Sequence, residues 1–395
     1  MNLRRVGALS LGLLALTAQA EEQPDGAYQA FLQALGGPAW IGSSSDHAMA
    51  DAVTRPIPAV DELPIDPAKQ TLGFQLYHDP GLSRDGTVSC ATCHMGMLGG
   101  ADRRVVSIGI GGLAGTRNAP TVFNSAFNFR QFWDGRAFNL DEQSLGPITN
   151  PVEMGHDLDA VVEGLASNPA YAKQFAALYP DGVTAANLGN AIAEQSRAMT
   201  RSDSRFNQYL SSGAATLSEQ ELNGWRRFND LGCASCHNGI NLGGNSYQKL
   251  GGIDDLALPG LLGDDAGLSL RTGREEDRQV FKVPSLHNVA LTPPYFHDGS
   301  VETLDQAVRL MGRLNSGREL SDSDAGDIVA FLGSLSSEFF AGMGRGMGSG
   351  MESGADGHGM PGGMHQHMQH MQHMQQMQQM QQINQGQNHS HEGVH

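Results

Sequence analysis

Apolar residues recur at helical spacing along much of the chain, whereas alternating strand patterns are scarce. Three segments begin at residues that typically cap helices, namely Asp157, Ser218 with Glu221, and Ser321 with Asp324. Apolar residues at helical spacing follow these caps: Leu158, Val161, Val162 and Leu165 after the first, Leu222, Trp225 and Phe228 after the second, and Ile328, Phe331, Leu332 and Leu335 after the third. Leu188, Ile192 and Met199 indicate a fourth helix. The pattern predicts a mainly α fold with long loops.

One helical pattern occurs twice. The spacing Gly-x-x-x-aromatic-x-Asp spans residues 73–79 and again residues 224–230, with Tyr77 and Phe228 as the aromatic residues. In both cases a Cys-x-x-Cys-His segment follows. The two halves therefore resemble diverged copies of one supersecondary plan, each with an aromatic ring on the helix that leads into the cysteines.

The cysteine segments carry the chemistry. They are Cys90-Ala-Thr-Cys93-His94 and Cys233-Ala-Ser-Cys236-His237, 143 residues apart, and they use all four cysteines of the chain. A thioredoxin-like pair or a four-cysteine zinc site is the simpler alternative, but neither explains the histidine after each pair. Cys-x-x-Cys-His attaches c-type haem through two thioethers and supplies an axial imidazole. We expect two covalently bound haem c groups.

Composition and motif spacing predict five regions. They are a signal peptide (1–20), an N-terminal arm with a helix near residues 27–35 (21–68), two cytochrome c-like haem domains (69–215 and 216–340) and a disordered tail (341–395).

The N-terminus has the pattern of an export signal. Arg4-Arg5 precedes an apolar run, and the small-residue site Ala18-Gln19-Ala20 predicts cleavage near Ala20 and a periplasmic protein. The run is too short for a permanent anchor, so no membrane anchor is expected. The formal charge of −17 becomes −19 without the two arginines. This acidic balance argues against nucleic acid as a partner.

The tail has an unusual composition. Residues 341–395 hold ten of the 17 methionines and eight of the 15 histidines, among Gly and Gln. Such a segment cannot bury a core. Two interpretations stay open, a solvated tail or a segment that binds copper through thioether and imidazole groups.

Motifs beyond the cysteines carry a resemblance that covers roughly residues 65–340. They are Leu82-Ser83, Arg117-Asn118-Ala119-Pro120-Thr121-Val122-Phe123-Asn124, Phe132-Trp133-Asp134-Gly135-Arg136-Ala137, Pro147, Asn150-Pro151-Val152-Glu153-Met154, Val283-Pro284-Ser285-Leu286, Pro294-Tyr295-Phe296-His297-Asp298-Gly299-Ser300 and Met311-Gly312. In these segments the chain resembles the bacterial di-haem cytochrome c peroxidases and their MauG-type relatives.

The resemblance implies unequal roles for the two haems. His94 would be the proximal ligand of a peroxidatic haem, whereas His237 and Met311 would be the two axial ligands of an electron-transfer haem. A Met/His pair fills both axial positions and raises the potential. Met311 could equally be a core residue of the helix predicted around 307–314. The resemblance also implies that Glu153 moves the peroxide protons and that Gln143 orients peroxide.

Further roles come from the same resemblance. Trp133 would lie between the haems and shorten the electron path, although a lone tryptophan is usually a packing residue. Asn118 with the carbonyls of Thr292 and Pro294 would form a calcium site, because hard oxygen ligands suit that ion. Dimerisation is common in the family and is left open here.

One position departs from the family. Where many members have Ser-Ile-Gly-His-Gly, with a histidine that blocks the peroxidatic iron, this chain has Ser107-Ile-Gly-Ile110-Gly. His156 is a weak candidate to replace that histidine as an iron ligand. We expect the first haem to be five-coordinate and high-spin without reductive activation.

These features predict a periplasmic enzyme that reduces hydrogen peroxide with electrons from a small cytochrome c or cupredoxin. A MauG-like enzyme that oxidises Trp or Tyr of a partner protein is the alternative, with a hint of copper handling from the tail. Met311 argues against it, since MauG itself has a tyrosine in that role. A third reading is an electron carrier or copper buffer without turnover.

Overall fold

The computed structural model describes residues 54–213, 215–251 and 265–340. All of them belong to one compact unit of the chain, Met1–Met343. The expected signal peptide, the helix near residues 27–35 and the Met/His-rich tail lie outside the described residues.

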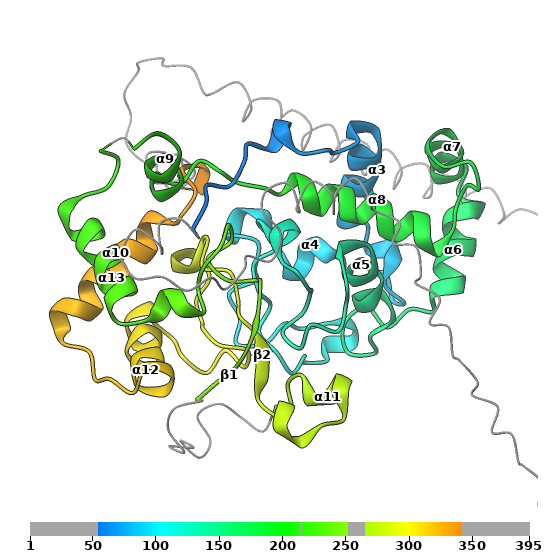
Figure 1. The fold of residues 1–395 in the computed structure, drawn as a ribbon. Helices are drawn as coiled ribbons and strands as arrows, with labels where there is room; N and C mark the ends of the chain where they lie inside the picture. Colours follow the sequence, from blue (N-terminus) through cyan, green and yellow to red (C-terminus); the bar gives the residue numbers. More distant parts are fainter. Residues whose placement is uncertain (1–53, 214, 252–264, 341–395) are drawn as a thin grey trace, which may run out of the picture. The chain divides into compact units, whose positions relative to one another are not determined.

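Helices make up most of the regular structure, as the periodicity predicts (Figure 1). Their bounds are α3 Pro67–His78, α4 Cys90–Cys93, α5 Leu140–Thr149, α6 Leu158–Ser167, α7 Pro169–Leu178, α8 Ala185–Ala198, α9 Arg205–Ser212, α10 Glu219–Asp230, α11 Ser269–Thr272, α12 Leu304–Ser316 and α13 Asp322–Ser334. The capping expectations are confirmed: the side chains of Asp157, Ser218 and Ser321 accept backbone hydrogen bonds at the starts of α6, α10 and α13. Met199 caps the end of α8 instead of lying inside it.

The strands are short. β1 (Tyr247–Lys249) and β2 (Val280–Lys282) form one antiparallel pair in which Tyr247 lies opposite Lys282 and Lys249 lies opposite Val280. Long loops connect the remaining elements, and they bring segments far apart in sequence to the same place.

Two helix pairs are built alike. α3 packs against α8, and α10 packs against α13. Gly73 permits the first contact, because a Cβ there would collide with the carbonyl oxygen of Ala191. Gly224 permits the second, because a Cβ there would collide with the carbonyl oxygen of Asp327. The repeated Gly-x-x-x-aromatic pattern therefore marks two equivalent close helix crossings.

Each helix pair has its own hydrophobic cluster. The first includes Leu72, Leu76 and Leu188, and the second includes Trp225 and Phe331. The segment after α13 returns to the first cluster. There Phe340 packs edge-on against Phe123 at 5.1 Å between ring centroids, and the amide of Phe339 donates to Asp203 Oδ2 at 2.9 Å.

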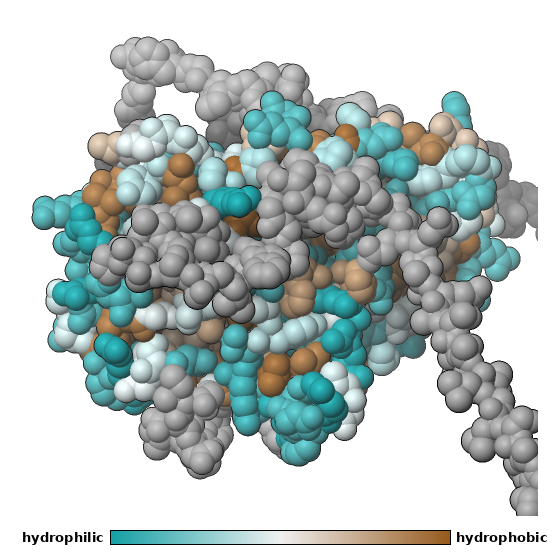
Figure 2. Space-filling view, in the orientation of Figure 1, coloured by the Kyte–Doolittle hydropathy of each residue, from teal (hydrophilic) through white to brown (hydrophobic). Residues whose placement is uncertain are grey.

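The surface of the described residues is mixed. Figure 2 shows hydrophilic and hydrophobic areas interspersed over the face in view. The described part of the chain contains no helix with both the length and the apolar character needed to cross a membrane.

Candidate haem sites

Both cysteine segments line one cavity of about 1100 Å³. α4 presents the first segment, and a 3₁₀ turn at Cys233–Ser235 presents the second. The shared lining residues are Cys90, Cys93, His94, Cys233, Cys236 and His237. None of these cysteines forms a disulfide. Within the described ranges, no group of three or more His, Cys, Asp or Glu side chains converges on a metal position.

The two histidines are held in the same way. His94 Nδ1 lies 3.2 Å from the Gly100 carbonyl oxygen, and His237 Nδ1 lies 3.3 Å from the Leu242 carbonyl oxygen. Donation from Nδ1 leaves Nε2 as the available ligand atom. Burial lowers the pKa of His94, and it lowers the pKa of His237 to about 4. Both rings are therefore neutral at neutral pH, the form that binds a metal.

An aromatic side chain accompanies each histidine. Tyr77 in α3 donates from its hydroxyl to the His94 carbonyl oxygen at 3.1 Å. Phe228 in α10 lies 6.3 Å from the His237 ring between centroids. Both line the cavity. Paired thiols, a neutral imidazole and a large cavity fit a covalently attached haem at each segment.

The cavity wall near the first segment is polar. Glu153 is half-buried, and its Oε1 accepts a hydrogen bond from Asn150 Nδ2 at 2.7 Å. Burial raises the pKa of Glu153, while the Arg136 charge and the Asn150 hydrogen bond oppose that rise. Gln143 in α5 lines the same cavity. A carboxyl group with a raised pKa beside an amide can accept and return protons.

Ile110 is buried away from this wall. Its side chain is 2% exposed and packs in the first hydrophobic cluster, and its amide donates to the Glu153 carbonyl oxygen at 2.9 Å. In this loop, Ser107 and Gly109 line the cavity instead. His156 is not among the lining residues, and its amide donates to the Ile148 carbonyl oxygen at 2.8 Å. The loop is thus fixed to the turn that carries Glu153.

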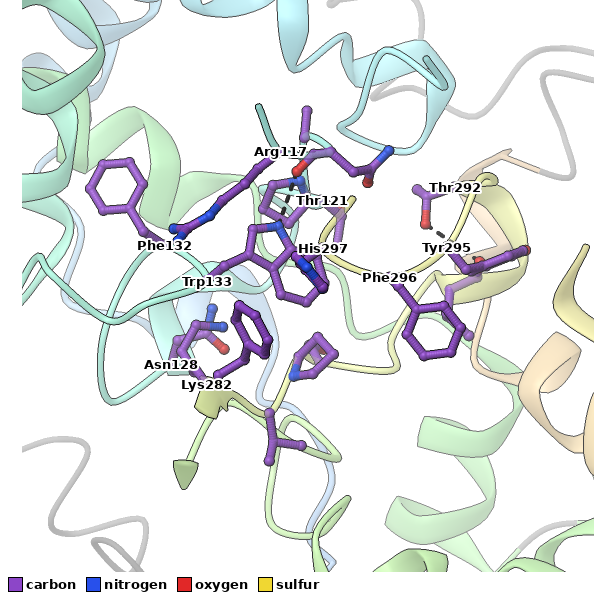
Figure 3. Close-up of a pocket in the computed structure, with 18 of the residues that line it drawn as sticks. Arg117, Thr121, Asn128, Phe132, Trp133, Lys282, Thr292, Tyr295, Phe296 and His297 are labelled. Carbon is purple, nitrogen blue, oxygen red and sulfur yellow. Dashed lines mark hydrogen bonds between the residues drawn. The ribbon is translucent and has the colours of Figure 1, made fainter. Parts of the chain in front are cut away.

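Trp133 stands at the junction of the two halves. Its Nε1 donates to the Asn118 carbonyl oxygen at 3.0 Å, and its own carbonyl oxygen accepts from the Lys282 amide at 2.8 Å. Its ring meets that of His297 edge-on, with 6.3 Å between centroids. Figure 3 shows Trp133, His297 and Arg117 around the cavity.

The residues expected to bind calcium share this region. Asn118, Thr292 and Pro294 all line the cavity. Asn118 Nδ2 donates to the Arg104 carbonyl oxygen at 2.8 Å, which leaves Oδ1 as the side-chain oxygen available to a cation.

Met311 lines the cavity from α12. Its helix neighbours Ala307 and Val308 line the same cavity, whereas Leu310 and Leu314 pack in a small hydrophobic cluster. Met311 and His237 therefore share one cavity, and ligation by Met311 stays a prediction.

Sequence reasoning missed several cavity residues. Arg117 bridges Asp134 at 2.7 Å and Asp265 at 2.6 Å, and Lys282 lines the cavity at the end of β2. For Lys282 a signal was present, because it is a charged residue inside the apolar run Val280-Phe-Lys-Val283. The ion pair between Arg117 and Asp265 could not be predicted from a local sequence pattern, because the two residues are 148 positions apart.

Known proteins resemble this chain in sequence. A family model described as di-haem cytochrome c peroxidase matches residues 67–215. The chain is 47% identical over 286 residues to cytochrome c peroxidase Ccp of Escherichia coli (strain K12), covering 72% of this chain and 61% of that protein. It is 42% identical over 290 residues to cytochrome c551 peroxidase of Nitrosomonas europaea, covering 73% and 85%. The matched part of this chain thus spans less than two thirds of the length of the Escherichia coli protein.

More distant relatives include MauG. The methylamine utilization protein MauG of Methylorubrum extorquens is 31% identical over 294 residues, covering 70% of this chain and 80% of that protein. Among solved structures, a MauG-like protein associated with microbial copper homeostasis matches with a TM-score of 0.63 and 28% identity, over 76% of this chain and 97% of that one. The motifs, the cavity and these similarities agree, and the chain belongs to the di-haem cytochrome c peroxidase family.

Proposed function

We propose that this chain is an exported di-haem peroxidase that reduces hydrogen peroxide to water with electrons from a small cytochrome c or cupredoxin. The reaction consumes two protons and two electrons for each peroxide and forms two water molecules. The observation that carries the proposal is the polar wall of the cavity, where Glu153 has a raised pKa and a fixed carboxylate beside the first cysteine segment. Its relatives at 42–47% identity are cytochrome c peroxidases.

The bound haems supply iron that reacts with peroxide at one site and exchanges electrons at the other. Around the first site, Glu153 takes a proton from one peroxide oxygen and delivers it to the other, and Gln143 orients the peroxide. At the second site, His237 and Met311 would hold the haem iron and so leave no place for peroxide. Trp133, which lines the same cavity, would shorten the path for electrons between the two haems.

Replacement of Glu153 tests this assignment. Glu153→Gln keeps the size and removes the proton acceptor, so steady-state peroxide consumption with a reduced donor is expected to fall about 10²- to 10⁴-fold. Glu163→Gln, at an exposed position of α6, is the matched control and should retain full activity. Undiminished turnover in Glu153→Gln, with two haems bound, would remove the mechanism.

The first haem is proposed to be open to peroxide as isolated. Support comes from Ile110, which cannot bind iron and whose burial and amide hydrogen bond hold the loop against the Glu153 turn. Absorption and EPR spectra of the oxidised protein should show one high-spin and one low-spin haem before any reduction. Peroxide should then be consumed without a prior reducing equivalent. Two low-spin haems in the oxidised protein would contradict this proposal.

A MauG-like activity is the second candidate, in which Trp or Tyr residues of a partner protein are oxidised. Ile110 favours it, as does the similarity to a MauG-like protein associated with copper homeostasis. The family relatives with higher identity and the cavity position of Met311 favour the peroxidase. Steady-state turnover with a reduced donor cytochrome, compared with the mass change of a candidate partner protein, separates the two.

The remaining proposals concern sites and assembly. Asn118 with the Thr292 and Pro294 carbonyl groups would bind calcium, and residues 341–395 would bind copper through Met and His. Cleavage near Ala20 would deliver the protein to the periplasm. The two haem domains would span residues 69–215 and 216–340, and a homodimer stays among the proposed assemblies.

A further inference from the structure

Lys282 is a buried cation in the wall of the cavity. It ends β2, its exposed fraction is 8%, and it lines the same cavity as the two cysteine segments. In the part of the chain that the structure describes, its ammonium group has no hydrogen-bond or ion-pair partner. Burying an unpaired charge is energetically costly, so a buried ammonium group is expected to have an anion beside it.

Two other cations of the described residues that are shielded from solvent are paired with carboxylates. Arg117 lies 2.7 Å from Asp134 and 2.6 Å from Asp265, and Arg197 lies 2.5 Å from Asp141. Lys282 differs from these two arginines because no carboxylate of the described residues is bonded to it.

The acidic side chains of the cavity are already engaged. Asp134 and Asp265 bind Arg117, Glu153 accepts from Asn150, and Asp298 accepts from the Ser300 amide at 3.1 Å. Each of these carboxylates thus has a partner other than Lys282. Since no carboxylate of the described cavity residues is bonded to Lys282, we infer that its anion belongs to a molecule bound in the cavity.

The position of Lys282 narrows the choice of anion. Its amide binds the Trp133 carbonyl oxygen, and two residues further on the Pro284 carbonyl group reaches the His237 ring. Lys282 therefore lies on a short segment between its contact with Trp133 and the Pro284 carbonyl group that contacts His237. Figure 3 shows Lys282 and Trp133 among the residues that line the cavity. Burial lowers its pKa to about 8, so the group stays largely charged at neutral pH. Haem carries two propionate carboxylates on one edge, and these are the anions that this cavity would receive.

We propose that Lys282 binds a propionate of a haem held in this cavity and raises the reduction potential of that haem. The inference rests on the haem content of the proposed function and not on peroxide turnover. A fixed positive charge beside the haem disfavours the ferric state, which carries one more positive charge than the ferrous state.

The test compares Lys282→Met with Lys282→Arg in the di-haem protein. The midpoint potential of each haem is measured by anaerobic spectroelectrochemical titration. Lys282→Met is expected to favour the ferric form of one haem about tenfold, which equals about 59 mV for a one-electron couple. Lys282→Arg keeps the charge and should stay close to the wild-type potential. The haem whose potential moves is the one whose propionate Lys282 binds.

Controls separate this role from a structural one. Lys173→Met removes the same charge from an exposed position of α7 outside the cavity lining and should leave both potentials unchanged. If Lys282→Met does not accumulate with two haems, Lys282→Gln is expected to show the same fall in potential. Unchanged potentials in the variants that remove the Lys282 charge, or an equal shift in Lys173→Met, would overturn the proposal. Because no step depends on peroxide, failure of the peroxidase assignment would leave this result interpretable.

Discussion

The two cysteine segments have similar supports for their histidines but face cavity walls of different chemistry. On the shared side, each histidine donates from Nδ1 to a backbone carbonyl group, and each preceding helix contributes an aromatic residue to the cavity. Gly73 and Gly224 allow the same close crossing of that helix with a second one. The part of the scaffold that orients the imidazole is thus duplicated.

The opposite walls differ in their chemistry. Near the first segment the cavity presents Glu153, Gln143 and Arg136, which can move protons and orient a polar ligand. Near the second it presents Met311 from α12, beside apolar residues such as Val308 and Leu332. The comparison teaches that one supersecondary plan holds the histidine in both halves, while the facing residues differ, as the proposed division between catalysis and electron transfer requires.

Met311→Leu is expected to have the largest effect on the difference between the two haem sites. Without its sulfur ligand the second haem would lose an axial bond, change from low-spin to high-spin and fall in potential. Absorption and EPR spectra of the oxidised protein measure the change. Met199→Leu, at a buried site of the first cluster outside the cavity lining, is the control and should leave both spectra intact. A preserved low-spin signal in Met311→Leu would mean that Met311 only packs.

Substitution of the two crossing glycines tests whether the halves share a scaffold. Gly73→Ala and Gly224→Ala would each push a methyl group into a backbone carbonyl group, with an expected loss of about 1–3 kcal/mol in the free energy of unfolding. Thermal or denaturant unfolding measures it. Gly164→Ala and Gly333→Ala, at helical positions with open space, are the matched controls and should be neutral or stabilising. Loss in only one half would show that the crossings are not equivalent.

A smaller effect is expected in the pH dependence of turnover, which Glu153 at the first site controls. Burial raises the pKa of Glu153, so its carboxylate is lost, and turnover falls, as pH drops through a value above the ordinary 4.5. Arg136 favours the carboxylate, so Arg136→Gln should move this acid limb to higher pH. The shift should be modest because the Arg136 side chain is 42% exposed and screened by solvent. The pH profile of kcat/KM reports it, with Arg226→Gln on the exposed side of α10 as control. Movement toward lower pH would contradict the assigned role of Arg136.

Local patterns were enough to predict much of this structure. Capping residues and apolar spacing identified α6, α10 and α13, and the repeated glycine pattern identified both helices that lead into the cysteines. The placement of Met311 on a helix was also predicted. These features depend on residues a few positions apart, which is why a single sequence reveals them.

Features that depend on distant contacts were not predicted. The bridge from Arg117 to Asp265 and the contact of Lys282 with Trp133 join segments that are far apart in sequence. The sequence showed that Ile110 cannot bind iron, but not that its side chain turns into the core while its amide holds the Glu153 turn. The roles of the site residues, calcium included, stay predictions.

The return of the chain after α13 has a consequence for dissecting the molecule. Phe340 belongs to the cluster built by α3 and α8, although it follows the last helix of the second half. The first half therefore requires residues from both sides of the second half to complete its core. A single cut between α9 and α10 would leave Phe123 exposed where Phe340 had covered it, so a fragment ending there needs the 337–340 segment supplied separately.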